Sequence, residues 1–229
     1  MIRTVAETGS TNDDVAALAA QGASEGLWLR ADRQTGGRGR QGRGWQSPLG
    51  NLYASTLVRI HPGDPPAPTL ALVAAVALHD VAAAHAPEHR LQIKWPNDLL
   101  ADGAKIAGIL LERAEDAVAI GFGVNLAHCP ENLDRPVTSL AALGASAPDP
   151  DAFAEMLAES FARWLVRWRS EGLAPIRTRW LAAAHAIGTA LSTAQGDGLF
   201  DGLDEAGALR LRLADGAVRV IHAGDVFLL

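Results

Sequence analysis

The segment from residue 69 to residue 86 constrains the fold more than any other part of the chain. It consists almost entirely of Ala, Leu and Val, and Asp80 is its only carboxylate. A helix that is apolar on every side must be covered on every side. The sequence therefore predicts a helix packed deep in a core. No apolar run is free of charged or turn residues for long enough to cross a bilayer, which predicts no membrane partner.

Patterning elsewhere predicts alternating strands and helices. Ser10 is a candidate N-cap for a helix that Gly22 ends, and Asp149 followed by Pro150 begins another that ends at Gly172. The segments predicted to be extended are the lead around Val5 and Ala6 and residues 27–31, 51–60, 91–95, 105–113 and 117–124, the last two joined as a hairpin. The first residues lack the apolar stretch of a secretory signal, so we expect a cytoplasmic protein.

After residue 187 the sequence changes to short alternating segments. Asp-Gly pairs at 197–198, 201–202 and 215–216 are typical of turns, and we expect four or five short strands that form a small β-barrel. The predicted organisation is a main domain over 1–187 and a β module over 188–229. The fold class is α+β, with a mixed β-sheet flanked by helices.

The overall composition excludes several classes of site. Cys129 is the only cysteine, so neither an intrachain disulfide nor a metal site built from several thiolates can form. A formal net charge of -6 argues against broad electrostatic binding to DNA or to anionic membranes. A basic cluster in this chain therefore needs a local explanation.

Residues 36–45 form such a cluster, because they combine five glycines with three arginines and Trp45. Glycine allows close backbone approach, and arginine forks match carboxylate and phosphate oxygens, so this loop can close over an anion. The alternative is a disordered RGG-like segment that binds nucleic acid. Trp45 is either an anchor to the core or a ligand contact. The Lys-Ser/Thr ending of a GxxxxGK[ST] phosphate loop is absent.

Three further segments carry candidate functional groups. Lys94 and Asp98 flank a proline turn between two predicted strands. Lys105 begins an otherwise apolar strand, in which Gly108 has no side chain and so lets another group approach closely. Asn125 ends a strand that is rich in glycine. No convincing Ser-His-Asp or Cys-His set accompanies them. Such an inventory is typical of an enzyme that stabilises phosphate charge without supplying a nucleophile.

Taken in order, these motifs resemble the biotin protein ligases. The matching segments are Ser10-Thr11-Asn12, the GRGRQGRGW loop, KWPND, KIAGILLE and GFGVN. The resemblance implies a core like that of class II aminoacyl-tRNA synthetases followed by an SH3-like barrel. It also implies that biotin and ATP, with Mg²⁺, form biotinyl-AMP, which then acylates a lysine of a biotin carboxyl carrier protein belonging to acetyl-CoA carboxylase or a related biotin-dependent carboxylase.

The resemblance also assigns residues to roles. The catalytic set comprises Arg40, Lys105, Asp98 and Lys94. We add the hypothesis that Asp98 helps to deprotonate the incoming lysine. The implied biotin contacts are Ser10, Thr11, Asn12, Gln34, Arg38, Gly39, Arg40, Lys105 and Gly108. The implied ATP and adenylate contacts are Arg38, Arg40, Arg43, Trp45, Lys94, Asn97, Lys105 and Asn125.

Alternatives to this interpretation remain open. A lipoate protein ligase has a similar core and also forms an acyl adenylate, although GRGR and KWPND favour biotin. A nucleic-acid-binding module and an inactive scaffold are more distant alternatives. The Ser10 motif begins too early to follow a winged helix, so we expect no operator DNA among the partners. A homodimer is left open.

Overall fold

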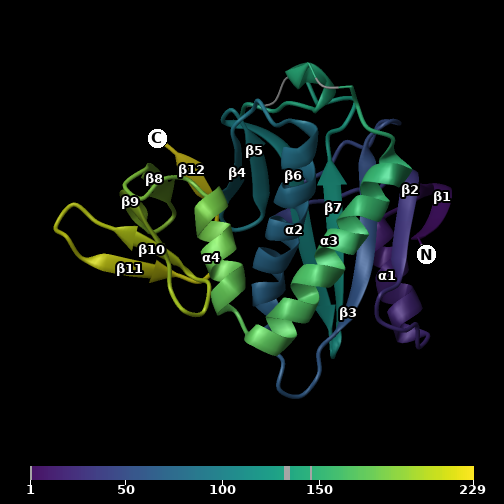
Figure 1. The fold of residues 1–229 in the computed structure, drawn as a ribbon, viewed down its shortest axis with the longest axis horizontal. Coiled ribbons are helices and arrows are strands. Elements are labelled where there is room, and N and C mark those ends of the chain that lie inside the picture. The colour runs from purple at the N-terminus through teal and green to yellow at the C-terminus, as the bar shows by residue number, and fades with distance from the viewer. Residues whose placement is uncertain (1, 132–134, 145) are drawn as a thin grey trace.

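The computed structural model describes residues 2–131, 135–144 and 146–229, which form two β-sheets and four α-helices (Figure 1). The larger sheet has seven strands in the order β1-β2-β3-β7-β6-β5-β4. Its strands are β1 (Ile2–Thr8), β2 (Trp28–Gln34), β3 (Leu52–Arg59), β4 (Leu91–Lys94), β5 (Asp98–Ala101), β6 (Ala104–Ala114) and β7 (Ala117–Val124). Only the β1–β2 pair is parallel, so the sheet is mixed, as predicted.

Helices cover both faces of this sheet. Helix α1 (Thr11–Ala20) packs on one face, where Val15 and Ala19 meet Leu29, Leu57 and Ala119. Helices α2 (Leu70–His85), α3 (Pro150–Glu171) and α4 (Ala174–Ala183) pack on the other. Beyond the short α1, the first face therefore has room for a cavity.

The predicted helix starts are confirmed. The Ser10 side chain accepts from the backbone N–H of Asp13, and the Asp149 side chain accepts from the N–H groups of Asp151 and Ala152. Helix α4 was not predicted, because its apolar residues form no continuous stripe along one face.

Helix α2 corrects one expectation. The segment Ala67–His85 is long and apolar enough to cross a bilayer, so the statement that no run meets this test was wrong. In the fold, 72% of that apolar window is buried. The sheet, α3 and α4 surround the helix in Figure 1, which explains why its sides need no charge.

The smaller sheet contains β8 (Ala190–Thr193), β9 (Gly196–Leu203), β10 (Leu209–Arg212), β11 (Val218–Ile221) and β12 (Val226–Leu228). It is antiparallel throughout, in the order β11-β10-β9-β8-β12, as expected for the small C-terminal module. The Asp-Gly pairs at 197–198 and 201–202 do not form turns but lie within β9. A Cβ at Gly198 would stand 2.6 Å from the Arg212 carbonyl oxygen, so this glycine permits close strand approach.

Both sheets share one hydrophobic core. Leu191, Phe200, Leu209 and Ile221 of the smaller sheet belong to the same buried cluster as α2, α3 and α4. The Trp180 ring of α4 lies 6.4 Å from the Phe200 ring, centroid to centroid. Position 187 falls between the end of α4 and the start of β8, and the division of the chain there remains a prediction.

Candidate active site

A cavity opens on the face of the large sheet that carries α1, and it encloses about 900 Å³ of space, including the part open to solvent. Its floor consists of β6 and β7, its roof is the glycine-rich loop, and one end is closed by the start of β12. Among the described residues, six cationic side chains line it, namely Arg38, Arg40, Arg43, Lys94, Lys105 and Arg135, together with the two carboxylates Asp98 and Asp225.

Glycines thin the floor at matched positions of two strands. Gly108 of β6 pairs with Gly123 of β7, and the Trp45 indole lies directly over both. A Cβ at Gly123 would stand 2.6 Å from Cε2 of this indole. Trp45 also lies beneath the Lys105 ammonium, with Nζ 5.4 Å from the ring centroid. Its buried Nε1 has no partner among the described residues. The indole therefore anchors the loop to the floor of the cavity.

Polar groups from α1, β2 and β3 close one end of the cavity. The Gln34 side-chain oxygen accepts from the backbone N–H of Thr11 at 2.9 Å, and Ser55, which the sequence analysis missed, bonds to Thr11 and Asn12 at 2.7 Å. The Asn12 amide donates to Leu110 O and to Glu112. These bonds fix the orientation of the Asn12 side chain, which lines the cavity, and its contact with biotin remains a prediction.

Arg38 is likewise engaged with protein. Its guanidinium forms ion pairs with Asp13 of α1 and with Glu112 of β6. Hydrogen bonding to Asp13 raises the pKa of Arg38 further above its ordinary value and lowers that of Asp13. Because the side chain is held by two carboxylates, it fastens the start of the loop to the sheet.

Arg40 and Arg43, at the tip of the loop, contact the C-terminal module. Arg40 donates to Gly224 O at 2.9 Å, and Arg43 donates to the Asp225 carboxylate at 3.0 Å. Arg40 also reaches the side-chain oxygen of Asn97 at 3.3 Å. The short 3₁₀ turn Arg40–Gly42 contains Gln41 at φ 56°. The two arginines therefore converge on a carboxylate at the cavity rim, as they would on a phosphate.

A third group surrounds Asp98 at the start of β5. Its carboxylate pairs with Lys105 and lies 3.8 Å from the Lys94 ammonium. Burial lowers the pKa values of Lys105 and Lys94 below the ordinary lysine value, and the attraction of Asp98 opposes both shifts. Lys94 also stands over the Phe227 ring at 5.8 Å. Two partly desolvated ammonium groups thus share one carboxylate and can turn to an anionic ligand.

The structure brings together most of the predicted site residues but leaves one outside. Asn125 is 2% exposed, its amide donates to Thr138 O, and it does not line the cavity. Its predicted contact with adenine therefore has no support in the geometry. Conversely, Asp225 and Phe227 line the cavity unpredicted, since only the packing of the two sheets brings their distant segment here.

The described residues contain no group of three or more His, Cys, Asp or Glu side chains able to hold a metal ion. The two cavity carboxylates are already paired with cations. This donor set does not fit a Mg²⁺ site built from protein ligands only, so Mg²⁺ remains a prediction as an ion that arrives with the nucleotide phosphates.

Comparison with known proteins covers both sheets. Residues 8–125 match the biotin/lipoate A/B protein ligase family, and residues 197–229 match the biotin protein ligase C-terminal domain. A biotin–[acetyl-CoA-carboxylase] ligase from Paracoccus denitrificans is 42% identical over 97% of this chain and 98% of its own. One from Mycobacterium tuberculosis is 38% identical over 97% of this chain and 86% of its own.

Solved structures show the same architecture. The biotin protein ligase from Aquifex aeolicus in complex with biotin and ATP superposes with a TM-score of 0.88, covering 100% of this chain and 99% of its own at 24% identity. At that identity the likeness concerns the fold. The sequence matches extend across the motifs that build the cavity, and they show that the chain belongs to the biotin protein ligase family.

Proposed function

We propose that this chain is an ATP-dependent biotin protein ligase. Its cavity combines a polar end, a glycine-thinned floor and a cationic end along one line, which suits joining a small carboxylic acid to a nucleotide. The observation that carries the proposal is the convergence of Arg40, Arg43, Lys94 and Lys105 on one cavity in an acidic protein. Two anionic reactants can align there only if their charges are neutralised.

In the first half-reaction, an oxygen of the biotin carboxylate attacks the α-phosphorus of ATP, and pyrophosphate leaves. Ser10, Thr11 and Gln34 would hold the biotin head group, and Lys105 would bridge the carboxylate and the α-phosphate. Arg40 and Arg43 would exchange Asp225 for phosphate oxygens. Trp45, Lys94 and Asn97 would border the adenylate. These roles follow the resemblance and agree with where the cavity places the side chains.

In the second half-reaction, the lysine amine of the carrier attacks the acyl carbon of biotinyl-AMP, and AMP leaves. We assign the proton from that amine to the Asp98 carboxylate, which would exchange Lys105 for the incoming lysine. An Asp98→Asn enzyme should make biotinyl-AMP but transfer it slowly. Transfer at the wild-type rate from this variant would refute the base assignment.

The experiment that tests the function is ATP–pyrophosphate exchange with Mg²⁺ in the presence of biotin, lipoate or no acid. Exchange that depends on biotin would support the proposal. Exchange with lipoate alone would favour a lipoate ligase, and none with either acid would favour a binding module.

The partners follow from the same proposal. The names of the relatives imply a biotin carboxyl carrier protein as acceptor. A cytoplasmic location and the lack of operator DNA and membrane partners remain predictions, with a homodimer still open. Retention on operator DNA at physiological salt would contradict the prediction that the protein does not bind operator DNA.

A further inference from the structure

The cavity has an order of subsites that can be read along strand β6. Leu110 and its partner Gly121 lie under Asn12, at the polar end. Gly108 comes two residues earlier in β6, under Trp45, and Lys105 three residues earlier still. Since a strand rises about 3.3 Å per residue, about 16 Å separate the backbone positions of Leu110 and Lys105. The Lys105 side chain reaches back along the strand, because a Cβ at Gly108 would stand 3.2 Å from its Nζ.

Beyond Lys105 the chain 135–138 runs beside β6. The Lys105 N–H donates to Pro136 O at 2.9 Å, and the Thr138 N–H donates to Lys105 O at the same distance. Lys105 and Val137 form a parallel bridge. The Thr138 carbonyl in turn accepts from the Asn125 amide. These bonds fix the backbone next to Arg135, whose side chain lines the same cavity as Lys105.

The chemistry of adenylation defines what must lie there. In an in-line displacement the attacking and leaving oxygens are on opposite sides of the phosphorus. If the head group occupies the polar end and the carboxylate reaches Lys105, the β- and γ-phosphates must extend away from the polar end. A guanidinium fork at that position matches phosphate oxygens.

We infer that Arg135 binds the β- and γ-phosphates of ATP and the departing pyrophosphate. The inference rests on the proposed function and adds a residue that none of the sequence motifs includes. Arg135 is close enough to the other cations that its charge contributes to the lowered pKa values of Lys94 and Lys105. A polyanion in contact with all three would relieve their mutual repulsion.

The test separates the two half-reactions. Arg135→Ala should raise the KM for ATP and for pyrophosphate in biotin-dependent exchange about ten-fold or more, as expected for the loss of a charged hydrogen-bond donor. Transfer of biotin from synthetic biotinyl-AMP to a carrier domain should not change, because that substrate lacks both phosphates. Arg135→Lys keeps the positive charge but not the forked guanidinium. Its KM for ATP should therefore lie between the values of the wild type and of Arg135→Ala.

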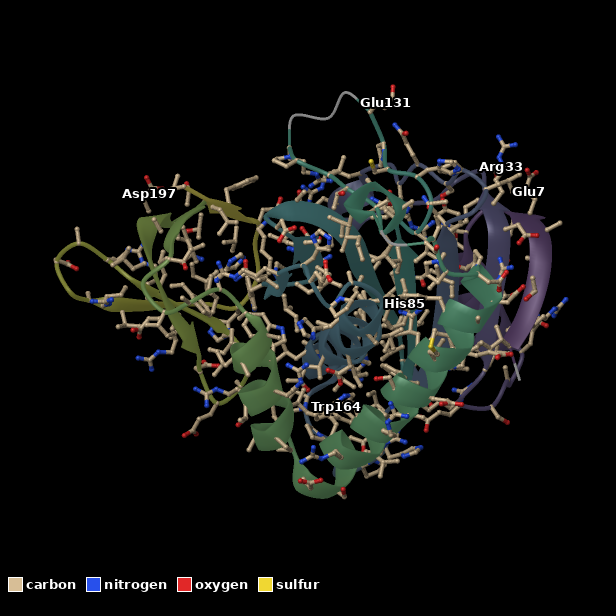
Figure 2. All side chains as sticks on the ribbon, turned by 45° about the horizontal axis from the view of Figure 1, so that its top comes forward. Glu7, Arg33, His85, Glu131, Trp164 and Asp197 are labelled. Atoms are coloured by element: carbon tan, nitrogen blue, oxygen red, sulfur yellow. The ribbon has the colours of Figure 1, made fainter. Side chains whose placement is uncertain are left out.

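Arg33→Ala is the matched control. Arg33 of β2 is exposed and lies near Glu7 of the edge strand β1, as Figure 2 shows, so its loss should leave both assays unchanged. An unchanged KM for ATP in Arg135→Ala would overturn the inference, and so would equal slowing of transfer from biotinyl-AMP, which would place the arginine on the acceptor side. If the wild-type chain itself shows no biotin-dependent exchange, the proposed function fails, and the assignment with it.

Discussion

Substituting Gly123 by alanine tests whether the glycine-thinned floor exists to seat Trp45. The added Cβ would lie 2.6 Å from Cε2 and 2.8 Å from Nε1 of the indole. Ordinary carbon contacts are about 3.5 Å or more, so the ring would have to move by about 1 Å. The floor cannot yield, because β7 is paired on both sides with β3 and β6.

Overpacking of this kind costs about 1–3 kcal/mol. If this free energy destabilises the loop in the position that binds ATP, the KM for ATP in biotin-dependent exchange should rise about 5- to 150-fold. Gly9→Ala is the control, since a Cβ at Gly9 meets nothing within 4 Å.

A double-mutant cycle with Trp45→Ala isolates the cause. Once the indole is removed, Gly123→Ala has nothing to collide with and should add little to the effect of Trp45→Ala alone. If Gly123→Ala costs as much in the Trp45→Ala background as in the wild type, the collision is not the reason for the glycine, and the argument fails.

Three further predictions follow from the contacts around the cavity. Glu112→Gln should raise the KM for biotin about ten-fold or more by weakening the hold on Asn12, since hydrogen bonds to a charged group contribute about 1.5–3 kcal/mol; an unchanged KM would contradict it. Asp225→Ala should speed tryptic cleavage after Arg43 in the ligand-free protein, measured by mass spectrometry, and identical cleavage would show that the contact does not hold the loop. Because burial lowers the pKa of Lys105, its positive charge is lost at a lower pH than that of an ordinary lysine, so exchange should fall with a midpoint below about 10.4; a midpoint at or above that value would contradict this.

Local sequence signals predicted most of the large sheet and three of the four helices. Ser10 and Asp149 mark helix starts because capping depends on residues within one turn. The β6–β7 hairpin was likewise predicted because both apolar runs and their turn are adjacent. The Asp-Gly pairs in β9 were wrongly predicted to be turns, because the dipeptide that favours turns also permits two strands to approach closely.

The sequence motifs predicted most residues that line the cavity, but they did not predict which other side chains contact those residues. The motif containing Asn12 identified the polar end, but only the fold shows that β3 and β6 occupy its amide. Asp225 and Arg135 lie far along the chain from the loop that they face, and neither belongs to a recognisable pattern. Asp225 reaches the cavity through the packing of the two sheets, and Arg135 through the backbone bonds of its segment to Lys105, and single-residue preferences encode neither.

The shared core has a consequence for how the molecule melts. Leu191, Phe200 and Leu209 are buried together with α2 and α4, so the smaller sheet cannot unfold without exposing the apolar surface of the larger one. The whole chain should therefore lose its structure in a single calorimetric transition. Ligands in the cavity would raise the melting temperature of both sheets together. A fragment ending at residue 187 would expose the side of Trp180 that faces Phe200, so it should aggregate more readily than the whole chain.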